Sequence, residues 1–280
     1  MAEFNKAFVI GHPITHSRSP LIHTYWLKTH KISGSYEGID VTPGTLAEFL
    51  ACVRSGEFAG GNVTVPLKEE AVTAVDCLTE NAKSIGAVNT IYMENGKLWG
   101  DNTDAYGFSA NLTDRAPEWT VCHSALVVGA GGAARAVIKS LMDAGLAQIY
   151  VLNRTLARAE EIAAAFGPTV FAAPLDSFTT YAPVADLFVN TSSLGMAGKE
   201  DKHFDFSAAK PSALVTDIVY VPLETNFLKS AHFAGLKTVD GLGMLLHQAV
   251  PGFERWFGIR TQVTPQLRAM VEADLFKVKP

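Results

Sequence analysis

SALVVGAGGAARA, residues 124–136, decides the fold of this 280-residue chain. Residues 124–128 form a mostly apolar run, which is typical of a strand buried on both faces of a parallel sheet. The glycine-rich residues 129–134 follow, then a helical pattern to about residue 144 and a second apolar strand at residues 149–152. Strand, glycine turn, helix and strand in this order predict a dinucleotide-binding α/β unit.

The glycine turn follows the pattern G-x-G-x-x-A, with Gly129, Gly131 and Ala134 at the defined positions. The first glycine allows a sharp turn, the second lets a pyrophosphate approach the backbone, and the small alanine lets the helix pack closely on the strand. The helix start then offers free amides and the positive end of its dipole to the phosphates. We therefore predict a cofactor site made by Gly129, Ala130, Gly131, Gly132 and Ala133. A purely structural turn is the alternative.

The choice of cofactor depends on the end of the second strand, where an NAD-specific site usually has Asp or Glu. This chain has Asn153, Arg154 and Thr155 there, and Arg158 follows one helical turn after Arg154. An acidic side chain would repel the 2′-phosphate of NADP, whereas guanidinium groups and a hydroxyl bind it through charge-assisted hydrogen bonds. We therefore predict that the cofactor is NADP. The alternative is that Arg154 is a solvated residue at a helix start.

Outside this unit, segments typical of strands alternate with segments typical of helices, which predicts an α/β fold with parallel sheets. A chain of 280 residues is long enough for two domains. The sequence texture changes within residues 104–120, so we place a domain boundary there. Earlier in the chain, Asn95-Gly96 predicts a hairpin between residues 87–93 and 97–99. Periodicity does not decide whether the last helices return to the first domain.

Composition and charge argue against several classes of protein. Hydrophobic residues make up 48% of the chain, which supports a buried core, and a formal net charge of -5 offers no basic surface for nucleic acid. No run reaches the ~18 apolar residues of a membrane helix, and the start of the chain is not typical of a signal peptide. Three separated cysteines favour a reduced, cytoplasmic setting, and no Cys/His cluster has metal-ligand spacing, so we expect no metal.

Two polar clusters in the first half of the chain suggest the oxidation of an alcohol. Residues 62–68, NVTVPLK, alternate polar and apolar side chains along a predicted strand that Pro66 ends, and Lys68 follows. Residues 102–104, NTD, stand just before the nucleotide-binding unit. Alcohol oxidation needs a base for the hydroxyl proton, which a lysine of lowered pKa can provide while a carboxylate orients it. Pairing of Lys68 with Asp104 is one hypothesis, and a solvated Lys68 is the other.

The chain resembles the shikimate dehydrogenase family over essentially its full length. Nine motifs occur in the family's order: GHPITHSRSP (11–20), GNVTVPLK (61–68), GAVNT (86–90), DNTD (101–104), GAGGAARA (129–136), NRT (153–155), NTSSLGM (190–196), DIVYVPLET (217–225) and GLGMLLHQA (241–249). The resemblance implies an α/β substrate-binding domain, residues 1–104 with 245–280, that the C-terminal helices complete. It also implies a Rossmann-type NADP-binding domain, residues 105–244, across a deep cleft.

The resemblance also implies roles for residues at matching positions. Lys68 would be the catalytic acid/base, with Asp104 as its partner, and both would contact the substrate. Ser17 and Ser19 would bind the substrate carboxylate, with help from Tyr220. Each polar side chain also has an ordinary structural interpretation: serines can cap the following helix, and a tyrosine can be an interface aromatic.

Further residues follow from the same resemblance. The ring hydroxyls of the substrate would contact Thr64, Asn89, Asp104 and Gln248. Thr191 and Gly241, which stand in the motifs NTSSLGM and GLGMLLHQA, are additional candidates for cofactor binding. The structural alternatives are that Asn89 satisfies backbone groups at a strand edge and that Gln248 is a surface residue of a helix.

The implied reaction is the reversible, NADP-dependent interconversion of shikimate and 3-dehydroshikimate, on the pathway to chorismate and the aromatic amino acids. Two other functions stay open: a quinate/shikimate dehydrogenase with broader substrate and cofactor use, and an NADP-binding regulatory protein without turnover. A glutamyl-tRNA reductase-like enzyme would need a nucleophilic cysteine and a tRNA-binding surface, and neither is evident. We expect no nucleic-acid or membrane partner. A homodimer is compatible with the sequence, which does not determine the oligomeric state.

Overall fold

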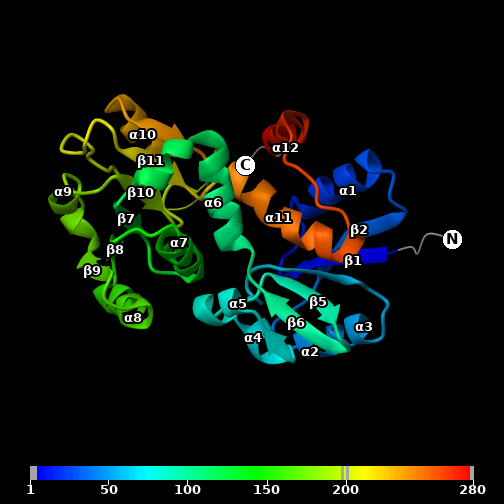
Figure 1. The fold of residues 1–280 in the computed structure, drawn as a ribbon. Helices are drawn as coiled ribbons and strands as arrows, with labels where there is room; N and C mark the ends of the chain where they lie inside the picture. Colours follow the sequence, from blue (N-terminus) through cyan, green and yellow to red (C-terminus); the bar gives the residue numbers. More distant parts are fainter. Residues whose placement is uncertain (1–4, 197–198, 200–201, 278–280) are drawn as a thin grey trace. The chain divides into compact units, whose positions relative to one another are not determined.

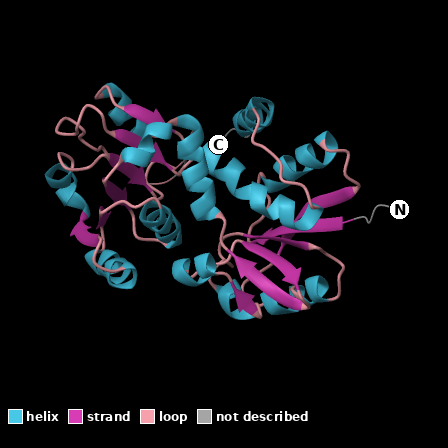
Figure 2. Cartoon of the chain, in the orientation of Figure 1, coloured by secondary structure: helices cyan, strands magenta, loops and turns pink. Residues whose placement is uncertain are grey.

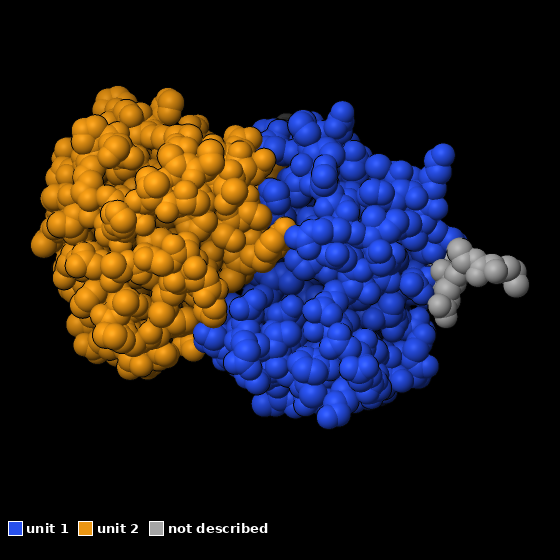
Figure 3. Space-filling view, viewed as in Figure 1, with its two compact units in different colours: residues 1–104, 246–279 blue, residues 105–245, 280 orange. Residues whose placement is uncertain are grey.

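The computed structural model describes residues 5–196, 199 and 202–277, and it has a mixed α/β fold (Figure 1, Figure 2). The chain forms two compact units, which Figure 3 shows in different colours. Unit 1 comprises residues 1–104 and 246–279, and unit 2 comprises residues 105–245. Each unit contains a six-stranded sheet. The predicted fold class, α/β with two domains, is therefore confirmed.

The sheet of unit 1 is mixed, with the strand order β2-β1-β3-β5-β6-β4. The strands are β1 (Asn5–Gly11), β2 (Gly34–Asp40), β3 (Gly60–Val63), β4 (Cys77–Leu78), β5 (Thr90–Glu94) and β6 (Lys97–Asp101). β1 pairs in parallel with β2 and β3, and β4 in parallel with β6. β5 runs antiparallel to both β3 and β6, so the parallel pairing that we predicted holds for only part of this sheet.

The antiparallel part of this sheet is the predicted hairpin. β5 and β6 pair from Thr90 with Asp101 to the end of the ladder beside the turn. Asn95 and Gly96 have φ angles of 52° and 73°, the left-handed conformation that a two-residue primed turn requires. The hairpin prediction is confirmed. The amide of Asn89, one residue before β5, then donates to the carbonyl of Asp101 at 2.9 Å, which brings two of the predicted polar clusters together.

Helices pack around this sheet to form the core of unit 1. They are α1 (Ser19–Thr29), α2 (Leu46–Phe49), α3 (Ala51–Arg54), α4 (Glu70–Ala74), α5 (Glu80–Ile85) and α12 (Pro265–Lys277), with the larger part of α11 (Leu242–Phe257). Leu46, Leu50 and Val53, in and between the short helices α2 and α3, are buried. These side chains pack with Phe8 and Ile10 of β1 in one cluster.

The sheet of unit 2 is parallel in every described strand pair, with the order β12-β11-β10-β7-β8-β9. The strands are β7 (Ser124–Val128), β8 (Gln148–Asn153), β9 (Val170–Pro174), β10 (Leu187–Asn190), β11 (Leu214–Asp217) and β12 (Lys237–Val239). The chain builds β8 and β9 on one side of β7 and then β10 to β12 on the other. This is the Rossmann order, whose switch point lies between β7 and β10.

Helices cover both faces of this sheet. They are α6 (Asp104–Arg115), α7 (Gly132–Asp143), α8 (Leu156–Phe166), α9 (Phe178–Tyr181) and α10 (Asn226–Phe233), with the short 3-10 helices η1 (Pro117–Val121) and η2 (Leu175–Ser177). Ala125 and Val127 of β7 pack with α6, α7 and α8, whereas Leu126 and Val128 pack with α9 and α10. Because both faces are covered, β7 is apolar at nearly every position. The residues where we placed a domain boundary form α6 and η1.

No helix among the described residues combines the length and the apolar character that crossing a bilayer requires.

Candidate active site

Gly129 forms the turn at the carboxyl end of β7. Its φ of 105° is a conformation that side chains disfavour, and a Cβ there would lie 2.9 Å from the Thr191 hydroxyl oxygen. Gly131 and Gly132 are different, because no described atom lies within 4 Å of the position that a Cβ would take. Other protein atoms therefore pack against Gly129, whereas the space beside Gly131 and Gly132 is open to a ligand, as a phosphate-binding turn requires.

The start of α7 lies directly after this turn. Gly131 is its N-cap, with extended backbone, and no side-chain oxygen caps the helix. The first-turn amides, which include those of Gly132 and Ala133, are therefore available to an anion beside Ala130. Ala134 is fully buried and belongs to the same cluster as Val127 of β7, so the helix lies close to the strand. These residues fit the diphosphate of a dinucleotide.

The carboxyl end of β8 carries the residues predicted to bind the 2′-phosphate. Asn153 is half-buried, and its Nδ2 donates to the Thr155 carbonyl at 2.9 Å, which holds the turn into α8. Arg154, Thr155 and Arg158 are all exposed within one helical turn. The amide of Arg158 donates to the Thr155 carbonyl at 3.1 Å. Two guanidinium groups and a hydroxyl on this exposed turn fit a phosphate group.

Thr191 and Gly241 have structural reasons for their identity. Both the amide and the hydroxyl of Thr191 donate to the Val128 carbonyl at 2.8 Å, so this buried side chain holds β10 against the glycine turn. A Cβ at Gly241 would lie 2.4 Å from the Ile218 carbonyl oxygen, so close backbone packing requires glycine there. Thr191 lies beside the glycine turn. Packing alone accounts for Gly241, and its cofactor role stays a prediction.

Lys68 and Asp104 form an ion pair in unit 1. The Nζ atom of Lys68 donates to Oδ2 of Asp104 at 2.6 Å, and the two side chains are 28% and 14% exposed. Lys68 follows the turn after β3, where its carbonyl accepts from the amide of Val88 at 2.8 Å. Asp104 begins α6, whose N-terminal dipole favours a carboxylate. The two polar clusters that the sequence separates by more than thirty residues therefore meet at this pair.

Asn89 joins this ion pair to Gln248 and to the backbone of Thr103. Its Nδ2 donates to Oδ1 of Asp104 at 2.8 Å, and it lies 3.4 Å from Oε1 of Gln248. Its Oδ1 accepts from the amide of Thr103 at 2.9 Å. Asn89 and Gln248 are buried, so Gln248 is not the surface residue of the structural alternative. The structure thus gathers Lys68, Asp104, Asn89 and Gln248 into one hydrogen-bonded polar cluster.

Thr64 lies directly after β3, whereas Ser17 lies in the segment between β1 and α1 and Ser19 begins α1. The amide of Thr64 donates to the Ile10 carbonyl at 2.8 Å, which sets it beside the start of the 11–19 segment. Ser17 Oγ accepts from the amide of Ser19 at 3.3 Å. Arg18 is the N-cap of α1 and its side chain makes no capping bond, but Ser17 Oγ accepts from the first amide of the helix, so the capping interpretation stays open for Ser17. Ser19 is buried and Ser17 is half-buried.

Sequence reasoning missed buried polar residues that connect these groups. Tyr36 donates its hydroxyl to Oδ1 of Asn62 at 2.6 Å, and Nδ2 of Asn62 donates to the Asn89 carbonyl at 3.0 Å. Burial raises the pKa of Tyr36 well above its usual range, although hydrogen bonds with Ser19 and Asn62 act in the opposite direction. Asn62 stands two residues before Thr64 in the alternating stretch, and this spacing was the available signal.

Tyr220 belongs to unit 2, on the segment after β11, whereas the other predicted substrate-binding residues belong to unit 1.

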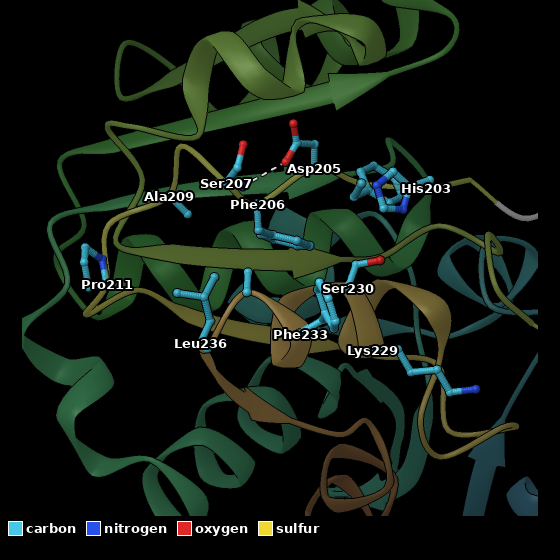
Figure 4. Close-up of a pocket in the computed structure, with 13 residues that line it drawn as sticks. His203, Asp205, Phe206, Ser207, Ala209, Pro211, Lys229, Ser230, Phe233 and Leu236 are labelled. Atoms are coloured by element: carbon cyan, nitrogen blue, oxygen red, sulfur yellow. Dashed lines mark hydrogen bonds between the residues drawn. The ribbon is translucent and has the colours of Figure 1, made fainter.

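Unit 2 also has a pocket of about 740 Å³ lined in part by Phe206, Phe233 and Leu236 (Figure 4). Its lining contains none of the residues predicted to bind substrate or cofactor. Phe233 on its rim is 95% exposed. This pocket is therefore separate from the candidate site.

A Rossmann-type sheet with an open glycine turn, in a chain that also holds a partly buried lysine–carboxylate cluster, defines the class of two-domain α/β dehydrogenases that use a nicotinamide nucleotide. Three family models match this chain: the shikimate dehydrogenase substrate binding domain at residues 9–91, shikimate / quinate 5-dehydrogenase at 113–232, and the shikimate 5'-dehydrogenase C-terminal domain at 241–270. The chain belongs to the shikimate dehydrogenase family.

Individual relatives agree with this placement. The shikimate dehydrogenase (NADP(+)) of Brucella abortus is 56% identical over 280 residues, which cover 99% of this chain and 97% of that protein. The shikimate 5-dehydrogenase of Thermus thermophilus, solved with NADP(H) and shikimate, is 36% identical with a TM-score of 0.85, covering 97% of this chain and 100% of that one. The quinate dehydrogenase of Corynebacterium glutamicum, solved with NAD, is 29% identical with a TM-score of 0.87, covering 96% and 99%.

Proposed function

We propose that this protein is a shikimate dehydrogenase that interconverts shikimate and 3-dehydroshikimate with NADP, in the pathway to chorismate and the aromatic amino acids. The observation that carries the proposal is the Lys68–Asp104 pair at 2.6 Å, held by Asn89 in a cluster of hydrogen-bonding side chains. Such a cluster suits a small, polyhydroxylated substrate, because each ring hydroxyl needs a donor or acceptor once it leaves water. The 56% identical relative named for this reaction supports the choice.

Lys68 supplies the acid/base chemistry. In the oxidation direction its amine form accepts the proton of the substrate hydroxyl, and in the reduction direction its ammonium form returns that proton to the carbonyl oxygen. Asp104 keeps the Lys68 amine in place through the 2.6 Å hydrogen bond and is itself held by Asn89. When bound, NADP supplies the hydride acceptor of the oxidation.

The remaining predicted residues bind and orient the ligands. Ser17 and Ser19, with Tyr220, hold the substrate carboxylate, and the ring hydroxyls contact Thr64, Asn89 and Gln248. The turn from Gly129 to Ala133 binds the diphosphate of NADP, and the exposed turn at residues 153–158 binds its 2′-phosphate. Support comes from the open space at Gly131 and Gly132 and from the absence of any acidic residue within 153–158.

A quinate/shikimate dehydrogenase with broader cofactor use is the second candidate. The similarity to the Corynebacterium glutamicum quinate dehydrogenase solved with NAD favours it. Arg154 and Arg158 favour NADP over NAD, and with it the first candidate. The two candidates differ in specificity, because one hydroxyl more on the ring leaves a different set of polar groups to be paired.

Steady-state kinetics with shikimate and quinate, each with NADP and with NAD, tests the proposal. We expect kcat/KM to be highest for shikimate with NADP, by about tenfold or more over each other pair. Comparable values for quinate or for NAD would favour the second candidate. No turnover of either acid would overturn both, and tight NADP binding in that case would favour the regulatory alternative.

We also propose a cytoplasmic location and a homodimer. The three cysteines are free thiols in the structure, as expected in a reducing compartment. Light scattering coupled to gel filtration measures the assembly directly, and the mass of a single 30.0 kDa chain at micromolar concentration would contradict the dimer.

A further inference from the structure

A buried carboxylate in unit 2, Asp217, has no part in the mechanism above. Asp217 ends β11 and lies directly opposite Asn190, which ends the neighbouring strand β10. Both side chains are fully buried. They therefore stand at the carboxyl ends of two central strands, the edge of a Rossmann sheet at which ligands bind.

Asp217 is an acceptor for three donors from three segments. Its Oδ2 accepts from Nδ2 of Asn190 at 3.0 Å and from the hydroxyl of Thr225 at 2.6 Å. Its Oδ1 accepts from the amide of Val219 at 2.9 Å. Thr225 is the N-cap of α10, where its hydroxyl also accepts from the amide of Leu228. One carboxylate thus connects the end of β10, the segment after β11 and the start of α10.

Asn190 passes this restraint on to the segment after β10. Its Oδ1 accepts from the amide of Ser192 at 3.1 Å and from the Ser192 hydroxyl at 2.7 Å. Its Nδ2 also donates to the Leu194 carbonyl at 3.2 Å. Thr191, the next residue after Asn190, lies against the glycine turn through its two bonds to Val128. The conformation of residues 191–194 therefore depends on an asparagine that Asp217 holds.

The energetics argue for a use of this carboxylate beyond packing. Burial raises the pKa of Asp217 to about 6, against the hydrogen bonds from Asn190, Thr225 and Val219 that lower it. A charge of this kind weakens the fold at neutral pH relative to a well-packed neutral group. The ionised carboxylate, however, is acceptor-only, which suits the three donors that surround it, whereas the protonated form would add a fourth donor.

We propose that Asp217 is a positioning residue, which sets the segments after β10 and β11 so that Thr191 and Tyr220 can serve cofactor and substrate binding. Val219, whose amide Asp217 accepts, is the residue directly before Tyr220. Thr191 follows Asn190, the other partner of the carboxylate. This inference rests on the proposed function, because that function assigns the tasks of Thr191 and Tyr220.

The test compares Asp217→Asn with Asp186→Asn. Asp186 is a matched control, because it is another hydrogen-bonded carboxylate of unit 2, beside the amino ends of β7 and β10, and it accepts from Ser124 and Lys210. We expect Asp217→Asn to raise the KM for shikimate and the Kd for NADP and to lower kcat/KM about a hundredfold, since small misplacements of binding groups have effects of that size. Asp186→Asn should lower Tm and leave KM and Kd within about twofold.

Two results would overturn the proposal. One is a folded Asp217→Asn variant whose KM for shikimate and Kd for NADP equal those of wild type. The other is an Asp186→Asn variant whose KM and Kd rise as much as those of Asp217→Asn. If Asp217→Asn does not fold, Thr225→Val and Thr225→Ser replace it. A raised KM in Thr225→Val that Thr225→Ser restores supports the proposal, and an unchanged KM in Thr225→Val overturns it. Should wild type lack shikimate turnover, the proposed function fails, while the Kd for NADP still tests the placement of Thr191.

Discussion

Lys68 differs from other lysines of the chain in what surrounds its amine. Lys83 also pairs with a carboxylate, that of Glu80 at 2.7 Å, but those side chains are 55% and 88% exposed. The Lys68–Asp104 pair is 28% and 14% exposed and is held by a second donor, Asn89. Water screens the first pair far more than the second. The residues around Lys68 in the sequence left a solvated lysine open as the alternative, and its spatial neighbours argue against that alternative.

Removal of the Lys68 amine should abolish most of the chemistry while the substrate still binds. We expect Lys68→Ala to lower kcat by about 10²–10⁴, the usual contribution of a general acid/base, with a small change in the Kd for shikimate. Stopped assays and equilibrium titration measure the two quantities. Lys83→Ala is the matched control and should keep wild-type kcat. A near-normal kcat in Lys68→Ala would remove the role that we assign to it.

Arg154 should discriminate between the two nicotinamide cofactors. Each charge-assisted bond to the 2′-phosphate is worth roughly 1.5–3 kcal/mol, which is about ten- to a hundredfold in affinity. We therefore expect Arg154→Ala to raise the Kd for NADP by that factor and to change the Kd for NAD little, as measured by calorimetry. Arg54→Ala, at an exposed arginine of unit 1 paired with Asp76, is the control. Equal losses for both cofactors would show that Arg154 does not contact the phosphate.

At the scale of elements, the sequence predicts a strand or helix well where turn-forming residues stand directly beside its apolar run. This is the case for β7 with its glycine turn and for the hairpin at Asn95-Gly96. β4 has only two residues and exists through pairing with β6, so no local pattern could predict it. α6 went unrecognised because its residues were interpreted as a boundary, although Phe108 and Leu112 form a buried face.

The glycine turn allows a prediction that separates binding from folding. Gly131 has φ of -102°, which alanine adopts easily, and a methyl group would enter open space. Gly131→Ala should therefore keep the Tm within about 1 °C of wild type and still raise the Kd for NADP tenfold or more, because the methyl occupies the approach of the diphosphate. Differential scanning calorimetry and NADP titration measure the two effects. Wild-type affinity in this variant would show that the turn does not bind the cofactor.

The amino ends of β7 and β10 should contribute a pH-dependent stability. Burial alone would raise the pKa of Asp186, but bonds from Lys210, His123 and Ser124 outweigh it and hold the pKa at about 2. Because this pKa lies below the ordinary value of 3.8, the ionised carboxylate stabilises the fold above about pH 4, and this stabilisation is lost as the pH falls toward 2.

Urea unfolding of wild type and Asp186→Asn between pH 7 and pH 3 measures this contribution. We expect the variant to be less stable by ~1–3 kcal/mol at pH 7, with the difference shrinking below pH 4. A difference that stays constant with pH would mean that the charge of Asp186 does not stabilise the strand ends.

At the scale of the whole molecule, motifs in sequence identified the chemical groups, and long-range packing determined their partners. Lys68, Asp104, Asn89 and Gln248 stand in separate motifs, and the structure joins them through bonds that span up to 159 positions in the chain. Asp217 was not singled out, because a buried polar residue of this kind is recognisable only from what it bonds in space. The Rossmann unit was predictable, since its strand, turn and helix follow one another directly.

A structure of the protein with shikimate and NADP bound tests the central claim most directly. We expect a ring hydroxyl of shikimate within about 3 Å of the Lys68 amine, as proton transfer requires, with Asn89 and Gln248 in contact with neighbouring hydroxyls. The substrate carboxylate should contact Ser17 and Ser19. Shikimate bound elsewhere, or bound with all of its hydroxyls directed away from Lys68, would contradict the account.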